Sequence, residues 1–78
     1  MPMDWLAKRF ANFLADVCKR KPEYKRKVST MLKAVEIGDY ILATDLAFNL
    51  LEEISFDEDI PEELRDQAGE LFLNLLPL

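Results

Sequence analysis

Tyr40-Ile-Leu-Ala-Thr-Asp-Leu-Ala-Phe-Asn-Leu-Leu-Glu-Glu-Ile54 is the stretch of sequence that decides the fold. Leucine and isoleucine recur along it at helical spacing, with the small Ala43 and Ala47 between them, so a helix here is apolar over most of its circumference. Gly38 suits the left-handed end of a preceding helix, and Asp39 suits the N-cap of this one. We predict a helix over residues 40–54 at the centre of the fold. Its expected core residues are Ile41, Leu42, Leu46, Leu50 and Ile54.

Three more segments show helical periodicity, over residues 4–20, 22–37 and 61–76. Their apolar stripes are, in order, Leu6, Phe10, Phe13, Leu14 and Val17; Tyr24, Val28, Met31, Leu32 and Val35; and Leu64, Ala68, Leu71, Phe72 and Leu75. The alternation typical of strands is missing. The sequence therefore predicts an all-α fold, a single compact bundle of four short helices formed by one domain over residues 1–78.

Polar residues and prolines indicate where these helices begin. Asp4 is a candidate N-cap for the first helix, and Pro22 can occupy the first turn of the second. Asp59 and Glu62 have the spacing of a capping box, and Pro61 between them suits the first turn of the last helix. We expect short connections throughout.

Charge is segregated along the chain. Residues 1–33 hold nine of the ten basic residues and three acids, a net charge of +6, whereas residues 34–78 hold twelve acids and Arg65, a net charge of −11. Together they give the −5 of the whole chain. Two opposed fields in so short a chain serve either to meet a charged partner or to hold the two halves together.

Catalysis and metal binding have little support in the residue types. The chain has no histidine, the commonest general base and metal ligand. Lys19-Arg20-Lys21 could lower the pKa of Cys18, but the nearby helix C-terminus opposes a thiolate, so we interpret Cys18 as a small residue at the core margin. Asp57, Glu58 and Asp59 lack the glycine and spacing of a calcium loop. With little room expected for a cavity of about 300 Å³, we predict no enzyme, no metal and no cofactor.

Residues 19–27, the basic segment, carry six positive charges in nine positions, and Tyr24 lies among them. A nucleic-acid site is one interpretation. However, a helix-turn-helix around Gly38 would make residues 40–54 the recognition helix, and that stretch has no basic residue. We expect the basic segment instead to coat the solvent-facing surfaces of the first two helices and to balance the acidic half, and nucleic-acid binding, at most weak, is the third hypothesis.

Residues 52–66, the acidic segment, concentrate eight acids within fifteen positions. Helix capping accounts for only two or three of them, and the rest repel one another, so a binding role is favoured. Phe56 stands among them either as an apolar anchor for a partner or as a plug over the end of the bundle. The candidate partner-binding residues are Glu52, Glu53, Phe56, Asp57, Glu58, Asp59, Glu62, Glu63 and Asp66.

Residues 36–53, Glu36-Ile-Gly-Asp-Tyr-Ile-Leu-Ala-Thr-Asp-Leu-Ala-Phe-Asn-Leu-Leu-Glu-Glu53, resemble a pattern of small bacterial immunity proteins of the Maf type. Those proteins pair a Gly-acid-Tyr helix start with Ala and Leu repeats. Ile60-Pro61, leading into Glu62-Glu63-Leu64, is also similar to their entry into the last helix. The resemblance covers residues 34–75 and implies a cytosolic antidote that binds and neutralises a cognate toxin.

The leading hypothesis is therefore a bacterial immunity protein that blocks a toxin, and we expect that toxin to be a nuclease, because an acidic face suits a groove that holds phosphates. The alternative is a helical adaptor, or a phage-type inhibitor of host machinery, that acts through the basic segment. The lone thiol and the lack of a secretory segment indicate a cytoplasmic protein, and no stretch approaches the roughly 20 apolar residues of a membrane span.

Overall fold

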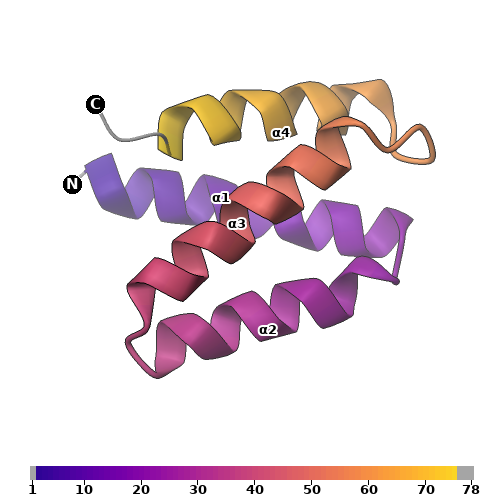
Figure 1. The fold of residues 1–78 in the computed structure, drawn as a ribbon. Helices are drawn as coiled ribbons and strands as arrows, with labels where there is room; N and C mark the ends of the chain where they lie inside the picture. The colour runs from indigo at the N-terminus through magenta and orange to yellow at the C-terminus, as the bar shows by residue number, and fades with distance from the viewer. Residues whose placement is uncertain (1, 76–78) are drawn as a thin grey trace.

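The structure, a computed structural model, describes the backbone of residues 2–75 and the side chains of residues 8–74. Four helices follow one another along the chain: α1 (Pro2–Arg20), α2 (Tyr24–Glu36), α3 (Tyr40–Ser55) and α4 (Glu62–Leu75) (Figure 1). The described residues form no strand. The predicted all-α bundle of four short helices is confirmed.

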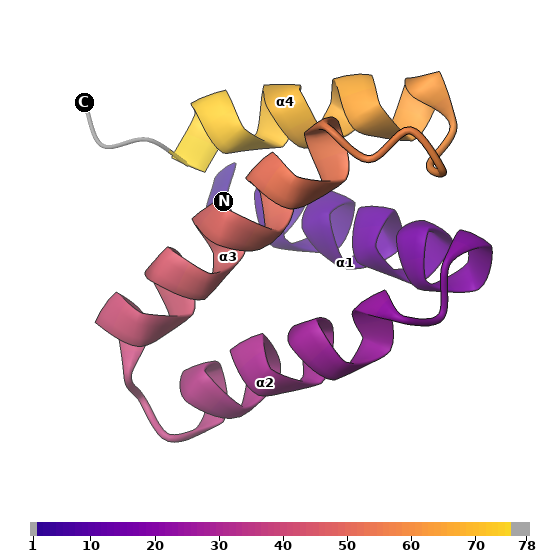
Figure 2. The same ribbon diagram turned by 45° about the vertical axis from the view of Figure 1, so that its right-hand side comes forward.

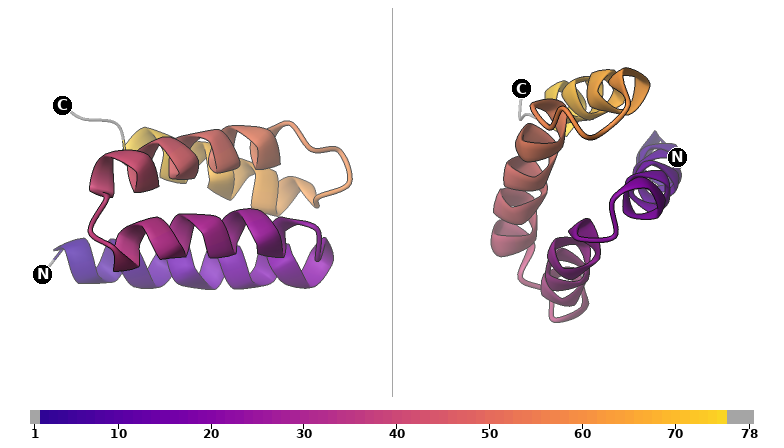
Figure 3. Two further views of the ribbon diagram at one scale, coloured as in Figure 1. Left: turned by 60° about the horizontal axis from the view of Figure 1, so that its bottom comes forward. Right: turned by 90° about the vertical axis from the view of Figure 1, so that its right-hand side faces the viewer.

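The four helices form a ring when the bundle is seen from its end (Figure 3, right). α3 packs against α2 and α4, and α1 closes the ring by packing against the same two helices. The α1–α2 and α3–α4 connections lie at one end of the bundle, and the α2–α3 turn lies at the other (Figures 1 and 2). Segments from the basic and acidic parts of the sequence therefore meet at one end.

The core is built most heavily on α3, as the sequence predicts. Five of its residues are buried, and Leu51 and Ile54 are fully inaccessible. Val17 from α1 and Leu71 from α4 pack into the same cluster. Sequence periodicity did not identify Leu51, which lies outside the predicted stripe, or Ile60, which is buried from the α3–α4 connection.

Local signals place the α2–α3 turn correctly. Gly38 has a φ of +78°, and the Asp39 carboxylate accepts a hydrogen bond from the Leu42 N–H at 3.1 Å. A left-handed glycine followed by a capping acid is the predicted arrangement. Because both signals act within four residues, tertiary packing has little influence on them.

Three predicted helix starts are wrong. α1 begins at Pro2, so Asp4 lies within it instead of capping it. Pro22 lies in the turn before α2, where its carbonyl accepts from the Lys25 N–H at 3.0 Å. The Asp59 carboxylate turns toward Lys21, 3.2 Å away, and Pro61 directly precedes α4. At Asp59, the long-range ion pair with Lys21 competes with local helix capping.

Apolar side chains are exposed around the α2–α3 turn. Leu32, Val35, Ile41 and Leu42, all expected in the core, are exposed, and Leu46 is only partly buried. Periodicity identifies the apolar side of a helix but not whether a neighbouring element covers it. Leu6 and Leu75, also predicted as core, lie outside the residues whose side chains are described.

Candidate protein-binding site at the acidic segment

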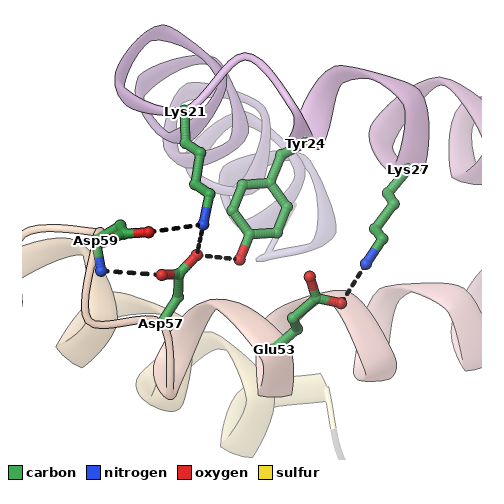
Figure 4. Close-up of polar contacts among 6 residues, drawn as sticks. All are labelled: Lys21, Tyr24, Lys27, Glu53, Asp57 and Asp59. Atoms are coloured by element: carbon green, nitrogen blue, oxygen red, sulfur yellow. Dashed lines mark hydrogen bonds and ion pairs between the residues drawn. The ribbon is translucent and has the colours of Figure 1, made fainter.

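The acidic segment comprises the end of α3, the α3–α4 connection and the start of α4, next to the α1–α2 connection (Figure 2). Basic side chains from residues 21–27 therefore lie beside the carboxylates of residues 53–59 (Figure 4). The fold brings the basic and the acidic segments together, and some residues of each segment form ion pairs with the other.

Asp57 is the centre of the polar network at this end (Figure 4). Its Oδ2 accepts from Lys21 Nζ at 2.8 Å and from the Tyr24 hydroxyl at 2.6 Å, and its Oδ1 accepts from the Asp59 N–H at 2.9 Å. Its side chain is only 12 % exposed. One carboxylate thus ties the α3–α4 connection to the end of α1 and to the start of α2.

The pKa values of the three side chains move in directions that agree with this network. The Lys21 ammonium and the Tyr24 hydroxyl both donate to the Asp57 carboxylate and lower its pKa to about 2. Burial first, and then the hydrogen bond to the carboxylate, raise the pKa of Tyr24, while the same carboxylate raises the pKa of Lys21. At neutral pH the network holds one anion, one cation and one neutral phenol.

Two further ion pairs join the halves of the chain. Lys27 on α2 pairs with Glu53 on α3, and Arg9 on α1 pairs with Glu70 on α4, with an N–O distance of 2.9 Å in the second pair. All of these pairs link residues 1–33 to residues 34–78. The segregated charges therefore hold the halves together, one of the two roles expected of them.

Phe56 immediately precedes Asp57 in the chain and is exposed to solvent. It is 79 % exposed, so the alternative in which Phe56 plugs the bundle end is wrong, and Ile60 of the same connection packs into the core instead. Backbone hydrogen bonds fix the connection on both sides of it: the Asp57 N–H donates to the Ile54 carbonyl at 3.1 Å, and the Ile60 N–H donates to the Asp57 carbonyl at 3.0 Å. A large aromatic ring thus stands in solvent on an ordered loop.

The eight acids of the segment divide into those that pair with a cation and those that do not. Glu53 and Asp57 face α2 and serve the ion pairs described above. Asp59 remains 80 % exposed although it also contacts Lys21. The other group is exposed and, within the described part of the chain, makes no ion pair; its members are Glu52, Glu58, Glu62, Glu63 and Asp66. Phe56 therefore belongs to a segment whose other exposed side chains include five carboxylates open to a partner.

The sequence identified the acids of this end but not the residues that order them. The sequence predicts that Lys21 and Lys27 coat a solvent-facing surface and balance the acidic half, and that Tyr24 belongs to the apolar stripe of the second helix. In the structure all three contact acids of the α3–α4 half. The charge segregation in the sequence was a signal that the two halves pair with each other, but it did not show which residues form the pairs. Lys19, Arg20, Lys25 and Arg26 remain exposed, as expected for a solvated face.

Other chemistry on this surface is limited. Cys18 is partly buried at the core margin, and burial raises its pKa, against a smaller opposing effect of Lys25.

A hollow of about 450 Å³ lies between α1 and α4, with Lys19, Arg20 and Glu63 in its lining, so the expectation of little room for such a volume is wrong. Among the described residues no three carboxylates or thiols gather into a metal site, and no helix suits a membrane span.

Comparison of the chain with protein-family models, with curated proteins and with solved structures finds no match. The resemblance to Maf-type immunity proteins therefore rests on the sequence motifs of residues 34–75.

Proposed function

We propose that this protein is an immunity protein that binds and neutralises a toxin through Phe56 and the exposed carboxylates around it. The single observation that carries the proposal is Phe56, which is 79 % exposed among Glu52, Glu58 and Glu62. Interface hot spots are enriched in aromatic residues that insert into a pocket and are ringed by polar groups. A phenylalanine that is exposed to solvent does not contribute to the core of its own chain.

The order of the loop supports the same proposal. Binding is weakened by the entropy of ordering mobile segments, and a loop already held in place avoids that loss. Asp57, Lys21 and Tyr24 hold this loop against two other helices. The inward-facing network of Asp57 thus holds in place the loop that carries the exposed Phe56.

The exposed carboxylates define the class of partner. Phe56 and these acids together fit a basic protein surface with an apolar pocket, and complementary charge accelerates the encounter of such partners. Nucleases present basic grooves because they bind phosphates, and an acidic inhibitor can occupy such a groove. Together with the resemblance over residues 34–75, this favours a nuclease toxin.

The proposal is tested by photo-crosslinking in the native host. A photoreactive phenylalanine analogue is placed at position 56, and the same analogue is placed at position 73 as the control. Leu73 is a matched position because it is 68 % exposed and lies near the far end of α4. We expect one basic protein to be crosslinked from position 56 only.

That protein should be toxic when it is expressed alone and harmless when this chain is co-expressed. Phe56→Ala should fail to protect, whereas Leu73→Ala should protect fully. Equal labelling from both positions, or a captured protein whose expression is harmless, would contradict the proposal.

A further inference from the structure

An apolar groove lies near the opposite end of the bundle from Phe56. It has a volume of about 350 Å³ and opens between α1, α2 and α3. Leu14, Met31 and Ala43 are buried at its base, while Leu32, Val35 and Tyr40 are exposed along its edges. None of the described residues that line it is charged. Exposed apolar surface of this kind marks a contact with another molecule.

A protruding apolar side chain stands directly beside the groove. Ile41, 82 % exposed, shares a shallow hollow with Tyr40, Thr44 and Asp45. Tyr40 and Thr44 also line the groove. Each copy of the chain therefore carries both a knob and a hole on adjacent parts of one surface. A two-fold symmetric dimer needs this arrangement, since the knob of each copy then enters the hole of the other.

The exposed area matches what such a dimer requires. A standard interface covers about 800 Å² per partner, and homodimer interfaces are about 65 % apolar, so each copy needs roughly 500 Å² of apolar surface. Leu32, Val35, Tyr40 and Ile41 are between 45 % and 82 % exposed. Together with Ile37 and Leu42, which are 76 % and 43 % exposed around the same turn, they provide exposed apolar surface on the order of several hundred Å².

Charge disfavours a dimer formed through the other end of the bundle. The chain carries a net charge of −5, so two copies that met through their acidic segments would repel each other. The groove lies beside the first turn of α3, and Phe56 follows the last residue of the same helix. The 16 residues of α3 span about 24 Å, well beyond the screening length of about 8 Å at physiological salt.

We propose that two copies of this chain form a symmetric dimer in which Ile41 of each copy enters the apolar groove of the other. The two acidic segments then lie at the outer ends of the dimer and remain open. This inference does not depend on the proposed function, because it concerns the purified chain alone.

The test is analytical ultracentrifugation of the full-length chain over a range of concentrations. We expect a monomer–dimer equilibrium, with the dimer dominant at the highest concentrations. Ile41→Glu should raise the dimer Kd about a hundredfold or more, because a carboxylate cannot enter an apolar groove unpaired. Leu73→Glu is the matched control, with the same charge on a similarly exposed helical residue, and should leave the Kd unchanged.

A charge-complementation arm tests the contact itself. Leu32→Lys alone should also give a monomer, since Leu32 lies on the groove edge that receives Ile41. An equimolar mixture of Ile41→Glu and Leu32→Lys should associate again, because the introduced charges then face each other. Circular dichroism of each variant checks that the helices are intact.

Three results would overturn the proposal. One is a wild-type chain that stays monomeric at every concentration, which would leave the groove to a different occupant. The second is an equal loss of dimer in Ile41→Glu and Leu73→Glu. The third is a mixture of the two complementary variants that remains monomeric.

Discussion

Asp57 shows how one residue serves folding and presentation together. The sequence groups it with eight other contact candidates, yet its carboxylate is turned inward and satisfied by Lys21, Tyr24 and the Asp59 N–H. Its neighbour Phe56 is turned outward. We conclude that Asp57 orders the loop and Phe56 is the side chain available to a partner.

This role gives a pH dependence with a defined sign. The pKa of Asp57 falls from its ordinary value of 3.8 to about 2 on folding, so its contribution to stability is complete above pH about 4 and is lost as the pH falls toward 2. Raised pKa values make the contributions of Lys21 and Tyr24 complete below pH about 10. The network is therefore strongest between pH about 4 and 10.

Denaturant unfolding of the wild type and of Asp57→Asn, measured at pH 4 and at pH 2, checks this prediction. The wild type should lose on the order of 2 kcal/mol more than the variant between these two values. Asp59→Asn is the control, since that side chain is 80 % exposed, and should behave like the wild type. An equal loss in all three proteins would show that Asp57 does not anchor the loop.

At the scale of single elements, the two glycines make a matched pair. Gly38 ends α2 with a φ of +78°, whereas Gly69 lies within α4, and a Cβ added at either position meets no atom within 4 Å. Gly38→Ala should destabilise the fold by about 1–2 kcal/mol, because an L-residue is strained in the left-handed region. Gly69→Ala should stabilise it by roughly 0.5–1 kcal/mol, because alanine favours a helix.

Thermal unfolding of both variants measures the two effects. A destabilised Gly69→Ala would indicate that the α4 backbone is not regular at this position. A neutral Gly38→Ala would indicate that the α2–α3 turn tolerates another conformation.

The sequence predicted elements well where the deciding forces are local. The Gly38-Asp39 turn and the burial of Leu50 and Ile54 follow from backbone preference and periodicity, which act within a few residues. The Asp59–Glu62 capping box failed because a lysine from a distant part of the chain contacts Asp59. Ile41 failed as a core residue because periodicity cannot show that no neighbouring element covers its helix face.

The candidate site was predictable in composition but not in geometry. Counting acids located the segment and singled out Phe56, but the sequence left open whether that ring covers the bundle or faces solvent. That choice depends on Ile60, which occupies the bundle end in its place. Likewise, the charge segregation indicated internal pairing without showing that Asp57 would be its centre.

At the scale of the whole molecule, basic and acidic segments share one end of the bundle (Figure 4). Lys21 and Lys27 pair with carboxylates, and Asp16 and Glu63 line the same hollow as Lys19 and Arg20. Phosphates approaching this end would meet negative charge as well as positive charge. A dense basic segment in the sequence therefore does not produce a basic surface of equal strength.

Fluorescence titration with duplex DNA and with single-stranded RNA at physiological salt checks this prediction. We expect no binding tighter than the non-specific range, about 10⁻⁴–10⁻⁶ M. A sub-micromolar complex that is lost in Lys25→Glu would favour a nucleic-acid function instead.

The central claim is that Phe56 and the acids around it form the interface with a basic protein. The most direct measurement is the kinetics of binding to the protein crosslinked from position 56. Phe56→Ala should raise the dissociation rate and weaken affinity by at least about 30-fold, or 2 kcal/mol. Glu58→Lys with Glu62→Lys should slow association and reduce its salt dependence, with little change in stability, because exposed charges contribute little to folding. The account is contradicted if the charge-reversed protein associates as fast as the wild type at low salt and Phe56→Ala dissociates no faster.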